Sequence, residues 1–320
     1  MKAIIFGVSG QDGNYLARFL CDKGYQVFGT TRTVSQKQQA QLKKILPKGL
    51  ELLHLDMSDL NATRKLINKI RPDEIYNLAG QSSVGLSFKS PSETILSIVV
   101  TTVNVLQSIN DISPQTRMFN AGSCEIYGQA NGVIDEGKHL INPLSPYAVG
   151  KAAAYHTVRN YRETYGLFAC TGILGNHDSA LRPPQFIIKK LLEGAYEISK
   201  GNRTTIEVGD LSVVRDWGFA GEYVEAMWKM LSTDNPNDYI IAAGESMSLY
   251  EYAEGIFSYF GLKLEDHLQI NDSYKRPQEI RSIELNPQKI SKDLGWNFSM
   301  NKKKLIDFMC EDYVKTTMNS

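Results

Sequence analysis

The feature that most constrains the fold is an apolar segment that runs directly into a glycine-rich turn at the start of the chain. Residues Lys2 to Gly7 (KAIIFG) are typical of a buried strand of apolar and β-branched residues. The turn that follows, Gly7 to Gly13 (GVSGQDG), precedes a segment of helical periodicity from about Asn14 to Lys23. A strand, a glycine turn and a helix in this order predict the first unit of a parallel sheet with helices on its faces.

The same alternation of strands and helices continues along the chain. We expect strands at 26–30, 51–55, 74–78 and 117–120, with helices near 61–70 and 92–110. Strands that alternate with helices predict right-handed crossovers, and hence a Rossmann-like, doubly wound parallel sheet. A sixth strand, at about 168–174, is expected to close this sheet before the chain leaves for a smaller lobe.

At 320 residues, the chain slightly exceeds the size at which one hydrophobic core stops growing. We therefore expect an α/β protein with a cofactor-binding Rossmann domain, residues 1–175 plus about 213–243, and a smaller mixed α/β substrate lobe, residues 176–212 and 244–320. In the second half we expect a strand at 240–244 and helices at 183–199, 215–231, 249–259 and 302–314.

The composition argues against several classes of partner and site. Lys plus Arg and Asp plus Glu are both 35, so no basic field indicates nucleic acid or an anionic membrane as a partner. The four cysteines form no CxxC pair, which argues against disulfides or zinc and favours a reducing cytoplasm. We see no signal-peptide pattern and no apolar run long enough to span a bilayer. The sequence thus predicts a cytoplasmic protein without a metal site or a membrane partner.

Ligands of parallel sheets bind at the carboxyl ends of the strands, and candidate residues follow the first two strands there. Gly7, Gly10 and Gly13 would let backbone N–H groups approach a pyrophosphate at a helix N-terminus, although a purely structural glycine turn is the alternative. No carboxylate follows the second strand to bind a ribose 2′-hydroxyl, as in NAD sites. Arg32 and Ser35 stand there instead and favour a 2′-phosphate, hence NADP; a solvated loop arginine is the alternative.

The next three strands also end in candidate residues. Asp56 and Met57 follow the third strand, where we expect the adenine, and residues 79–82 follow the fourth. Ser123 and Glu125 follow the fifth strand and would face the same cleft. Ser123 is a candidate for a hydrogen bond to a substrate hydroxyl. Glu125 is a candidate proton-transfer group, with a surface loop carboxylate as the alternative.

A tyrosine and a lysine four residues apart are the main catalytic candidates. Ser145 is suited to an N-cap and Pro146 to the first helical position, so we expect a helix to begin here. Tyr147 and Lys151 then share one helix face, one turn apart. A phenol with a pKa of about 10 is a poor base at neutral pH, and a neighbouring ammonium can lower that pKa. We therefore expect Lys151 to activate Tyr147; an exposed polar pair is the alternative.

Basic residues in the second half of the chain are candidates for neutralising a diphosphate, because charge-assisted hydrogen bonds to phosphate are strong. They are Lys189, Lys190, Arg203, Arg215 and Arg276. Each alone is also compatible with a solvated surface. Arg215 and Arg276 are the preferred pair.

Eight sequence blocks, in order along most of the chain, carry a family resemblance. They are GVSGQDGNYLARFL at Gly7, IYNLAGQSSVGLSF at Ile75, SCEIYG at Ser123, SPYAVGK at Ser145, GILGNHDS at Gly172, VRDWGFAGEYVEAMW at Val214, KRPQEI at Lys275 and LGWNF at Leu294. With these blocks, the chain resembles the extended short-chain dehydrogenase/reductase superfamily and, within it, the GDP-mannose 4,6-dehydratases.

The resemblance implies roles for individual residues. Implied as catalytic are Ser123, Glu125, Tyr147 and Lys151, with Ser123 where the family usually has Thr. Implied as contacts of NADP are Gly7, Gly10, Gln11, Asp12, Gly13, Arg32, Ser35, Asp56, Met57, Leu78, Ala79, Gly80, Gln81, Ser82, Tyr147, Lys151, His177 and Arg182. Implied as contacts of a GDP-sugar are Ser82, Ser123, Glu125, Asn176, Lys190, Arg215 and Arg276. Without the resemblance, His177 would be interpreted as a loop or core histidine.

The implied activity is that of a hydro-lyase that converts GDP-mannose to GDP-4-keto-6-deoxymannose. Tyr147 would take the proton of the hexose 4-hydroxyl as a hydride passes from carbon 4 to NADP, and Glu125 would act at carbon 5 before the hydride returns to carbon 6. The fold of the superfamily also implies a homodimer or homotetramer. Three alternatives stay open: a dehydratase of a related GDP-sugar such as GDP-heptose, a reductase or epimerase of a GDP-4-keto-6-deoxy-sugar, and a catalytically silent NADP-binding sensor.

Overall fold

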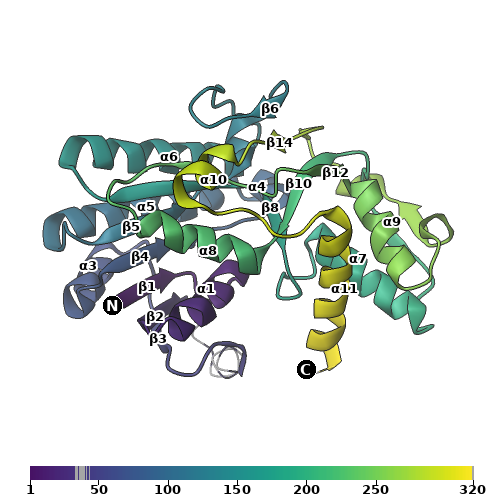
Figure 1. Ribbon diagram of the computed structural model, residues 1–320, viewed down its shortest axis with the longest axis horizontal. Helices are drawn as coiled ribbons and strands as arrows, with labels where there is room; N and C mark the ends of the chain where they lie inside the picture. The colour runs from purple at the N-terminus through teal and green to yellow at the C-terminus, as the bar shows by residue number, and fades with distance from the viewer. Residues whose placement is uncertain (33–34, 36–39, 41, 43, 319–320) are drawn as a thin grey trace.

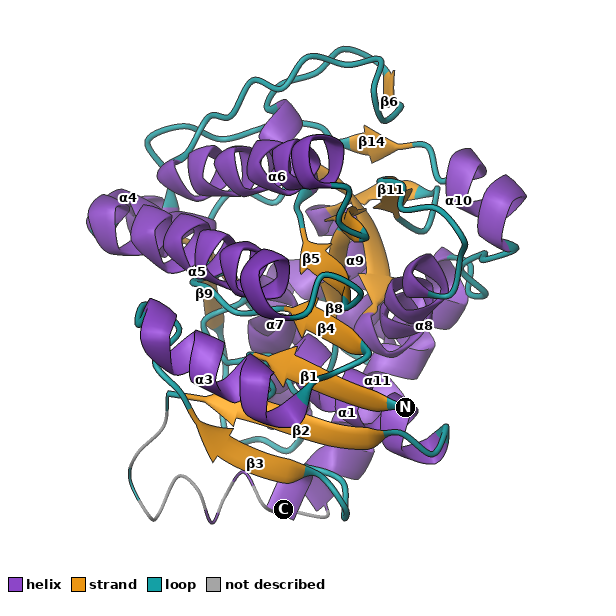
Figure 2. Ribbon diagram, turned by 90° about the vertical axis from the view of Figure 1, so that its left-hand side faces the viewer, coloured by secondary structure: helices purple, strands orange, loops and turns teal. Residues whose placement is uncertain are grey.

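The computed structural model of the protein describes residues 1–32, 35, 40, 42 and 44–318. A seven-stranded sheet forms its centre, in the order β11-β7-β5-β4-β1-β2-β3 (Figure 2). The strands are β1 (Lys2–Phe6), β2 (Gln26–Thr31), β3 (Glu51–His54), β4 (Glu74–Asn77), β5 (Arg117–Ala121), β7 (Ala169–Leu174) and β11 (Tyr239–Ile241). All its pairings are parallel, so the predicted Rossmann-like sheet is confirmed.

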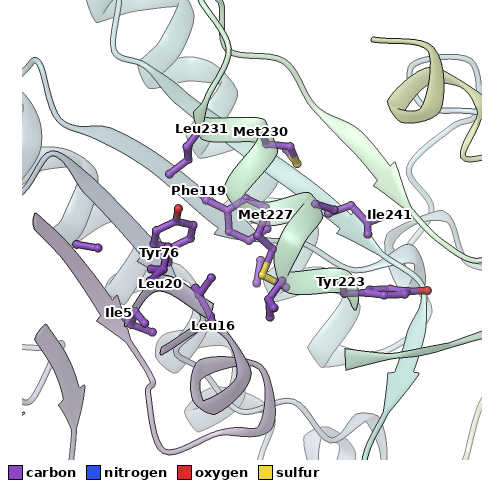
Figure 3. Packing of buried hydrophobic residues seen from close by; sticks show 14 of the residues in the cluster. Ile5, Leu16, Leu20, Tyr76, Phe119, Tyr223, Met227, Met230, Leu231 and Ile241 are labelled. Atoms are coloured by element: carbon purple, nitrogen blue, oxygen red, sulfur yellow. The ribbon is translucent and has the colours of Figure 1, made fainter. Parts of the chain in front are cut away.

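Helices cover both faces of this sheet (Figure 2). On one face lie α3 (Leu60–Ile70), α5 (Pro91–Ile112) and α6 (Pro146–Tyr165), and on the other α1 (Gln11–Asp22), α8 (Ala220–Leu231) and α10 (Gln288–Leu294). The sequence of β1 is almost wholly apolar because both of its faces are buried: Ile4 packs toward the first set of helices and Ile5 toward the second. Figure 3 shows Ile5 with Leu16 of α1, Phe119 of β5 and Met227 of α8 in the second cluster.

A second apolar core holds together the smaller part of the molecule, at the opposite end from β1 to β5 (Figure 1). It is built from α7 (Ile187–Ser199), α9 (Leu249–Tyr259) and α11 (Lys302–Met318), with β9 (Ile206–Val208) paired to β13 (Leu268–Ile270). Between the two cores, β10 (Val214–Phe219) joins β8 (Asn176–Asp178) and β12 (Ser246–Ser248) in a three-stranded sheet. The remaining elements are α4 (Val84–Lys89), β6 (Val133–Ile134), β14 (Glu284–Leu285) and the 3₁₀ turns η1 (Cys124–Tyr127), η2 (Leu264–Asp266) and η3 (Asp272–Tyr274).

Two of the predicted elements in the second half and the predicted edge of the sheet were wrong. The segment 215–231 is not one helix, because β10 occupies Val214–Phe219 and pairs with β8 and β12 before α8 begins at Ala220. The helix expected from Pro183 begins only at Ile187, and Phe186 closes a turn back to the Pro183 carbonyl. The sheet does not end at β7 either, since β11 pairs beyond it after the chain has passed through the smaller core.

The sequence analysis found no apolar run long enough to span a bilayer, but helix α5 is such a run. By length and composition alone, α5 is long and apolar enough to cross a membrane. In the fold it packs between α3 and α6, with Ile98, Val105 and Leu106 buried, and core helices commonly pass the same test.

Candidate active site

Two adjoining cavities open at the carboxyl ends of the central strands. The first has a volume of about 970 Å³ and is lined by the four residues expected to be catalytic: Ser123, Glu125, Tyr147 and Lys151. The second has a volume of about 780 Å³ and is lined by the glycine-rich turn after β1. Both cavities are lined by Asp12, Leu78, Gly80, Ser82 and Arg182. The structure therefore brings the two predicted groups of residues together along one continuous wall.

The start of α6 is built as the sequence predicts. The Ser145 hydroxyl accepts a hydrogen bond from the Ala148 N–H at 3.1 Å, and Pro146 occupies the first turn. Tyr147 and Lys151 therefore lie one turn apart, and they are only 8% and 9% exposed. The alternative of an exposed polar pair is wrong.

The electrostatics of this pair differ from the prediction. Burial raises the pKa of Tyr147, and a hydrogen bond with Ser123 offsets only part of that rise. The Lys151 ammonium lies 5.7 Å from the centre of the Tyr147 ring and donates to the Ala121 carbonyl at 2.7 Å. Burial lowers the pKa of Lys151 to about 8. The expected lowering of the Tyr147 pKa was therefore wrong in direction, because the loss of solvent outweighs the favourable neighbours.

Glu125 lies on η1, directly after β5, and is buried with 9% of its surface exposed. Burial raises the pKa of its carboxyl, and the positive charges of Arg215 and Arg276 oppose that rise. A carboxyl whose pKa is raised keeps its proton to a higher pH than an exposed carboxyl and is a stronger base once ionised. The alternative of a surface loop carboxylate is wrong.

Glu279 is a residue of the site that the sequence analysis missed. One oxygen of its carboxylate accepts from Arg215 at 2.9 Å and from Arg276 at 3.1 Å. The two arginines proposed for a diphosphate are therefore held side by side. A signal was present, because Glu279 stands three residues after Arg276 in the block KRPQEI.

All the residues expected to contact the substrate line the first cavity. They are Ser82, Ser123, Glu125, Asn176, Lys190, Arg215 and Arg276. Arg203 lines it as well, whereas Lys189 does not: its ammonium donates to the Ala180 carbonyl at 2.8 Å and lies 4.4 Å from the centre of the Tyr313 ring.

The glycine-rich turn leaves no room for a Cβ at Gly7 or Gly13. Gly7 has a φ of +86°, and a Cβ there would lie 3.0 Å from the Ala79 backbone. A Cβ on Gly13 would lie 2.5 Å from the Gly7 carbonyl oxygen. Helix α1 begins at Gln11 rather than at Asn14, and its N-cap, Gly10, has no capping side chain. Such a bare helix start beside a cavity fits the pyrophosphate of a dinucleotide.

Most of the residues expected to contact a cofactor line the second cavity. They are Gly7, Gly10, Gln11, Asp12, Gly13, Arg32, Asp56, Met57, Leu78, Ala79, Gly80, Ser82 and Arg182. Tyr147, Lys151 and His177 line the first cavity. Ser35 and Gln81 line neither. Gln81 instead fixes the start of α4, donating from its amide to the Ser83 carbonyl at 2.8 Å.

His177 reaches the glycine-rich turn from β8. Its Nε2 lies 3.0 Å from a carboxylate oxygen of Asp12, its Nδ1 lies 2.8 Å from the Gly175 carbonyl oxygen, and its ring stacks on Tyr223. Burial disfavours the charged imidazolium, but Asp12 outweighs this effect and raises the pKa of His177. Arg182 lies 3.2 Å from Asp178 and reaches both cavities.

Comparison with known proteins gives a consistent family. The family model described as GDP-mannose 4,6 dehydratase matches residues 4–309. GDP-mannose 4,6 dehydratase 1 of Arabidopsis thaliana is 37% identical over 97% of this chain and 89% of its own length. Among solved structures, UDP-glucose 4-epimerase of Thermus thermophilus in complex with NAD superposes with a TM-score of 0.85 at 22% identity, over 98% of this chain and 99% of that chain. The dTDP-glucose 4,6-dehydratase of Streptomyces venezuelae, solved with NAD bound, gives a TM-score of 0.86 at 20% identity, over 99% and 98%.

Proposed function

Because the chain belongs to the GDP-mannose 4,6-dehydratase family, a family of hydro-lyases, we propose that it converts GDP-mannose to GDP-4-keto-6-deoxymannose. The observation that carries this proposal is that the four catalytic candidates and the arginine pair line a single cavity. That cavity adjoins a glycine-lined cavity with the features of a dinucleotide site.

Tyr147 is the proposed acceptor of the proton from the hexose 4-hydroxyl. Its phenol is hydrogen-bonded to Ser123, so a sugar hydroxyl bound between the two would have both a proton acceptor and a second polar partner. Lys151 is held by the Ala121 carbonyl in the same cavity and supplies positive charge beside the phenol when protonated. A bound nicotinamide would supply the redox chemistry, taking a hydride from carbon 4 and returning it to carbon 6.

Glu125 is the proposed acid and base at carbons 5 and 6. A ketone at carbon 4 acidifies the hydrogen on carbon 5, which a carboxylate can then remove. The same group, once protonated, can assist the loss of the carbon-6 hydroxyl as water. The raised pKa of Glu125 supports this double role, because it makes the carboxylate a stronger base and lets the carboxyl keep its proton to a higher pH than an exposed carboxyl.

Arg215 and Arg276 are proposed to bind the diphosphate of the substrate. Arg215 is 4% exposed in its side chain, and its charge is balanced by Glu279. A diphosphate would bring two further negative charges to this pair, and guanidinium groups bind phosphate with paired hydrogen bonds.

NADP is the proposed cofactor, rather than NAD. Arg32 lines the second cavity, directly after β2, and no carboxylate precedes it at the end of that strand. Replacing Arg32 with Ser should weaken NADPH binding about 10- to 100-fold, because a hydrogen bond to a charged group contributes about 1.5–3 kcal/mol. Binding of NADH should change little. Fluorescence titration of both nucleotides would measure the two affinities, and equal losses for both would contradict the proposed role of Arg32.

The division of work between the two parts of the chain is also a proposal. Residues 1–175 with about 213–243 would hold the cofactor, and 176–212 with 244–320 would bind the sugar nucleotide.

A homodimer or homotetramer in the cytoplasm is proposed as well. It would form through α5 and α6, where Leu96 and Val149 are 58% and 43% exposed. Light scattering would give the mass in solution.

The proposed reaction is tested by incubating the purified protein with GDP-mannose and a catalytic amount of NADP, then following the product by mass spectrometry. We expect a product lighter by one water, with no net formation of NADPH. Net consumption of NADPH on a keto-sugar would instead indicate a reductase. Turnover of GDP-heptose but not of GDP-mannose would show that the substrate is GDP-heptose.

A further inference from the structure

Six carboxylates line the first cavity, and the proposed chemistry does not account for all of them. They are Asp12, Asp178, Asp210, Glu125, Glu193 and Glu279. Asp12 contacts His177, Asp178 contacts Arg182, and Glu279 contacts both arginines of the proposed diphosphate site. Asp210 accepts a hydrogen bond from the Ser212 N–H at 2.8 Å. Glu125 lies with the catalytic candidates. Glu193 is the carboxylate of this lining left without an assigned task.

Glu193 projects from α7, where Lys190 stands three residues earlier. Residues three apart lie on the same face of a helix, and both line the first cavity. Across the part of the chain that the structure describes, the Glu193 carboxylate makes no hydrogen bond and no ion pair within 4 Å. Its charge acts on Lys189, one helical turn earlier, and opposes the lowering of the Lys189 pKa by burial. The Lys190 ammonium lies 4.0 Å from the centre of the Tyr274 ring. Arg203, which lines the same cavity, adds another cationic group. One acceptor and two cationic donors thus remain available here.

Among the common nucleobases, guanine presents the matching pattern. Its N1–H and N2 amino group are two adjacent donors, which a carboxylate accepts with two hydrogen bonds. Its O6 and N7 are acceptors, which Lys or Arg side chains bind. Uracil presents a single N–H between two carbonyl oxygens, so a carboxylate facing its edge would be repelled by those oxygens. A carboxylate beside cationic donors therefore favours guanine over uracil.

We infer that Glu193 reads the N1 and N2 donors of the guanine base, and that Lys190 or Arg203 binds its O6. This inference rests on the proposed function, because it takes the nucleotide of the substrate to be GDP. It adds the residues that select the base: the face of α7 that carries Lys190 and Glu193 is the base-recognition surface. Glu193 contacts the base and not the reacting carbons, so it is a specificity-determining residue.

The test compares GDP with IDP, whose base lacks only the 2-amino group. Calorimetry on the full-length protein should show wild type binding GDP about 10- to 100-fold more tightly than IDP, the loss expected for one hydrogen bond to a charged group. In Glu193→Ala, this ratio should fall close to one. Glu197→Ala is the matched control. Glu197 lies on the same helix, accepts from Asn202 at 2.8 Å and does not line the cavity, so the wild-type ratio should be kept.

A Glu193→Ala variant that unfolds at the wild-type temperature and keeps the wild-type GDP-to-IDP ratio would overturn the inference. If that variant does not fold, Glu193→Met, which keeps the length of the side chain but removes both carboxylate oxygens, takes its place in the same comparison. Because the readout is nucleotide binding, the result is separable from the proposed reaction. A protein that selects GDP through Glu193 but releases no water from GDP-mannose would refute the proposed function alone. A dehydratase indifferent to Glu193 would refute this inference alone.

Discussion

Replacing Glu125 with Gln separates the catalytic and the structural effects of one buried carboxyl. The substitution keeps the size of the side chain but removes its ability to exchange a proton. General acid–base catalysis by one side chain contributes about 100- to 10,000-fold to a rate, which corresponds to about 3–5 kcal/mol in the activation barrier. We expect kcat for water loss to fall by that factor. GDP binding should be retained, because the two arginines proposed to bind the diphosphate are held by Glu279.

The same substitution should stabilise the fold at alkaline pH. The pKa of Glu125 is raised above its ordinary value of 4.5, so the folded state binds its proton more tightly than the unfolded state does. The stabilisation that the protonated carboxyl provides is complete below pH 4.5 and is lost as the pH rises through the folded pKa. Each unit of upward shift then costs about 1.4 kcal/mol, or about 2 °C in the unfolding temperature of a chain of this length. Gln cannot ionise and avoids this cost.

The assay pairs turnover, measured by mass spectrometry of the GDP-sugar, with thermal unfolding of wild type and Glu125→Gln at pH 5 and pH 8. The unfolding temperature of the variant should exceed that of wild type by more at pH 8 than at pH 5. Turnover within tenfold of wild type would refute the role of Glu125 in proton transfer. A variant that is less stable than wild type at pH 8 would refute the account of its raised pKa.

Three further outcomes follow from the structure. The turnover rate should fall above about pH 8, where Lys151 loses its proton, and Lys151→Arg should move this fall to higher pH in a pH–rate profile. Gly13→Ala should weaken NADPH binding about 10- to 100-fold in a fluorescence titration, because its Cβ would lie 2.5 Å from the Gly7 carbonyl oxygen. Asp238→Ala should lower the free energy of unfolding by about 3–5 kcal/mol, and the melting temperature by about 4–7 °C, because it leaves Arg162 without its partner at 2.7 Å. Thermal unfolding checks this loss, and an unchanged melting temperature would contradict it.

Elements whose signals are local were predictable from the sequence. The start of α6 depends on Ser145 and Pro146, which act within one turn of the helix, and α9 spans the predicted 249–259 because Ser248 and Glu251 form a capping box at its start. Strand β1 was similarly recognisable from its apolar run, which reflects burial on both faces.

Elements that depend on distant partners were not predictable in the same way. The segment Val214–Phe219 carries apolar and aromatic residues that suit a helix or a strand, and its pairing with β8 and β12 decides for the strand. A strand was expected at 240–244, but the place of β11 at the edge of the sheet depends on its pairing with β7, more than 60 residues earlier in the chain. Neither partner is visible within the local sequence window.

The same distinction applies to the site. The spacing of Tyr147 and Lys151 placed them together, yet it gave the wrong direction for the Tyr147 pKa. Spacing determines which groups are neighbours, whereas burial depends on the complete fold. Glu279 was missed for a related reason, since its importance lies in two arginines that are 64 and three residues away along the chain.

The segment after β7 explains why the two cavities form a single site. Gln11, in the first turn of α1, donates to the His177 carbonyl at 3.2 Å and accepts from the Ser179 hydroxyl at 2.8 Å, while Asp12 contacts the His177 ring. The same segment supplies Asn176 and Arg182 to the cavity lined by the catalytic candidates. A shift of the glycine-rich turn would therefore displace residues that line the first cavity, because three side-chain contacts connect the two. The first and the second cavity thus depend on the same few hydrogen bonds for their relative position.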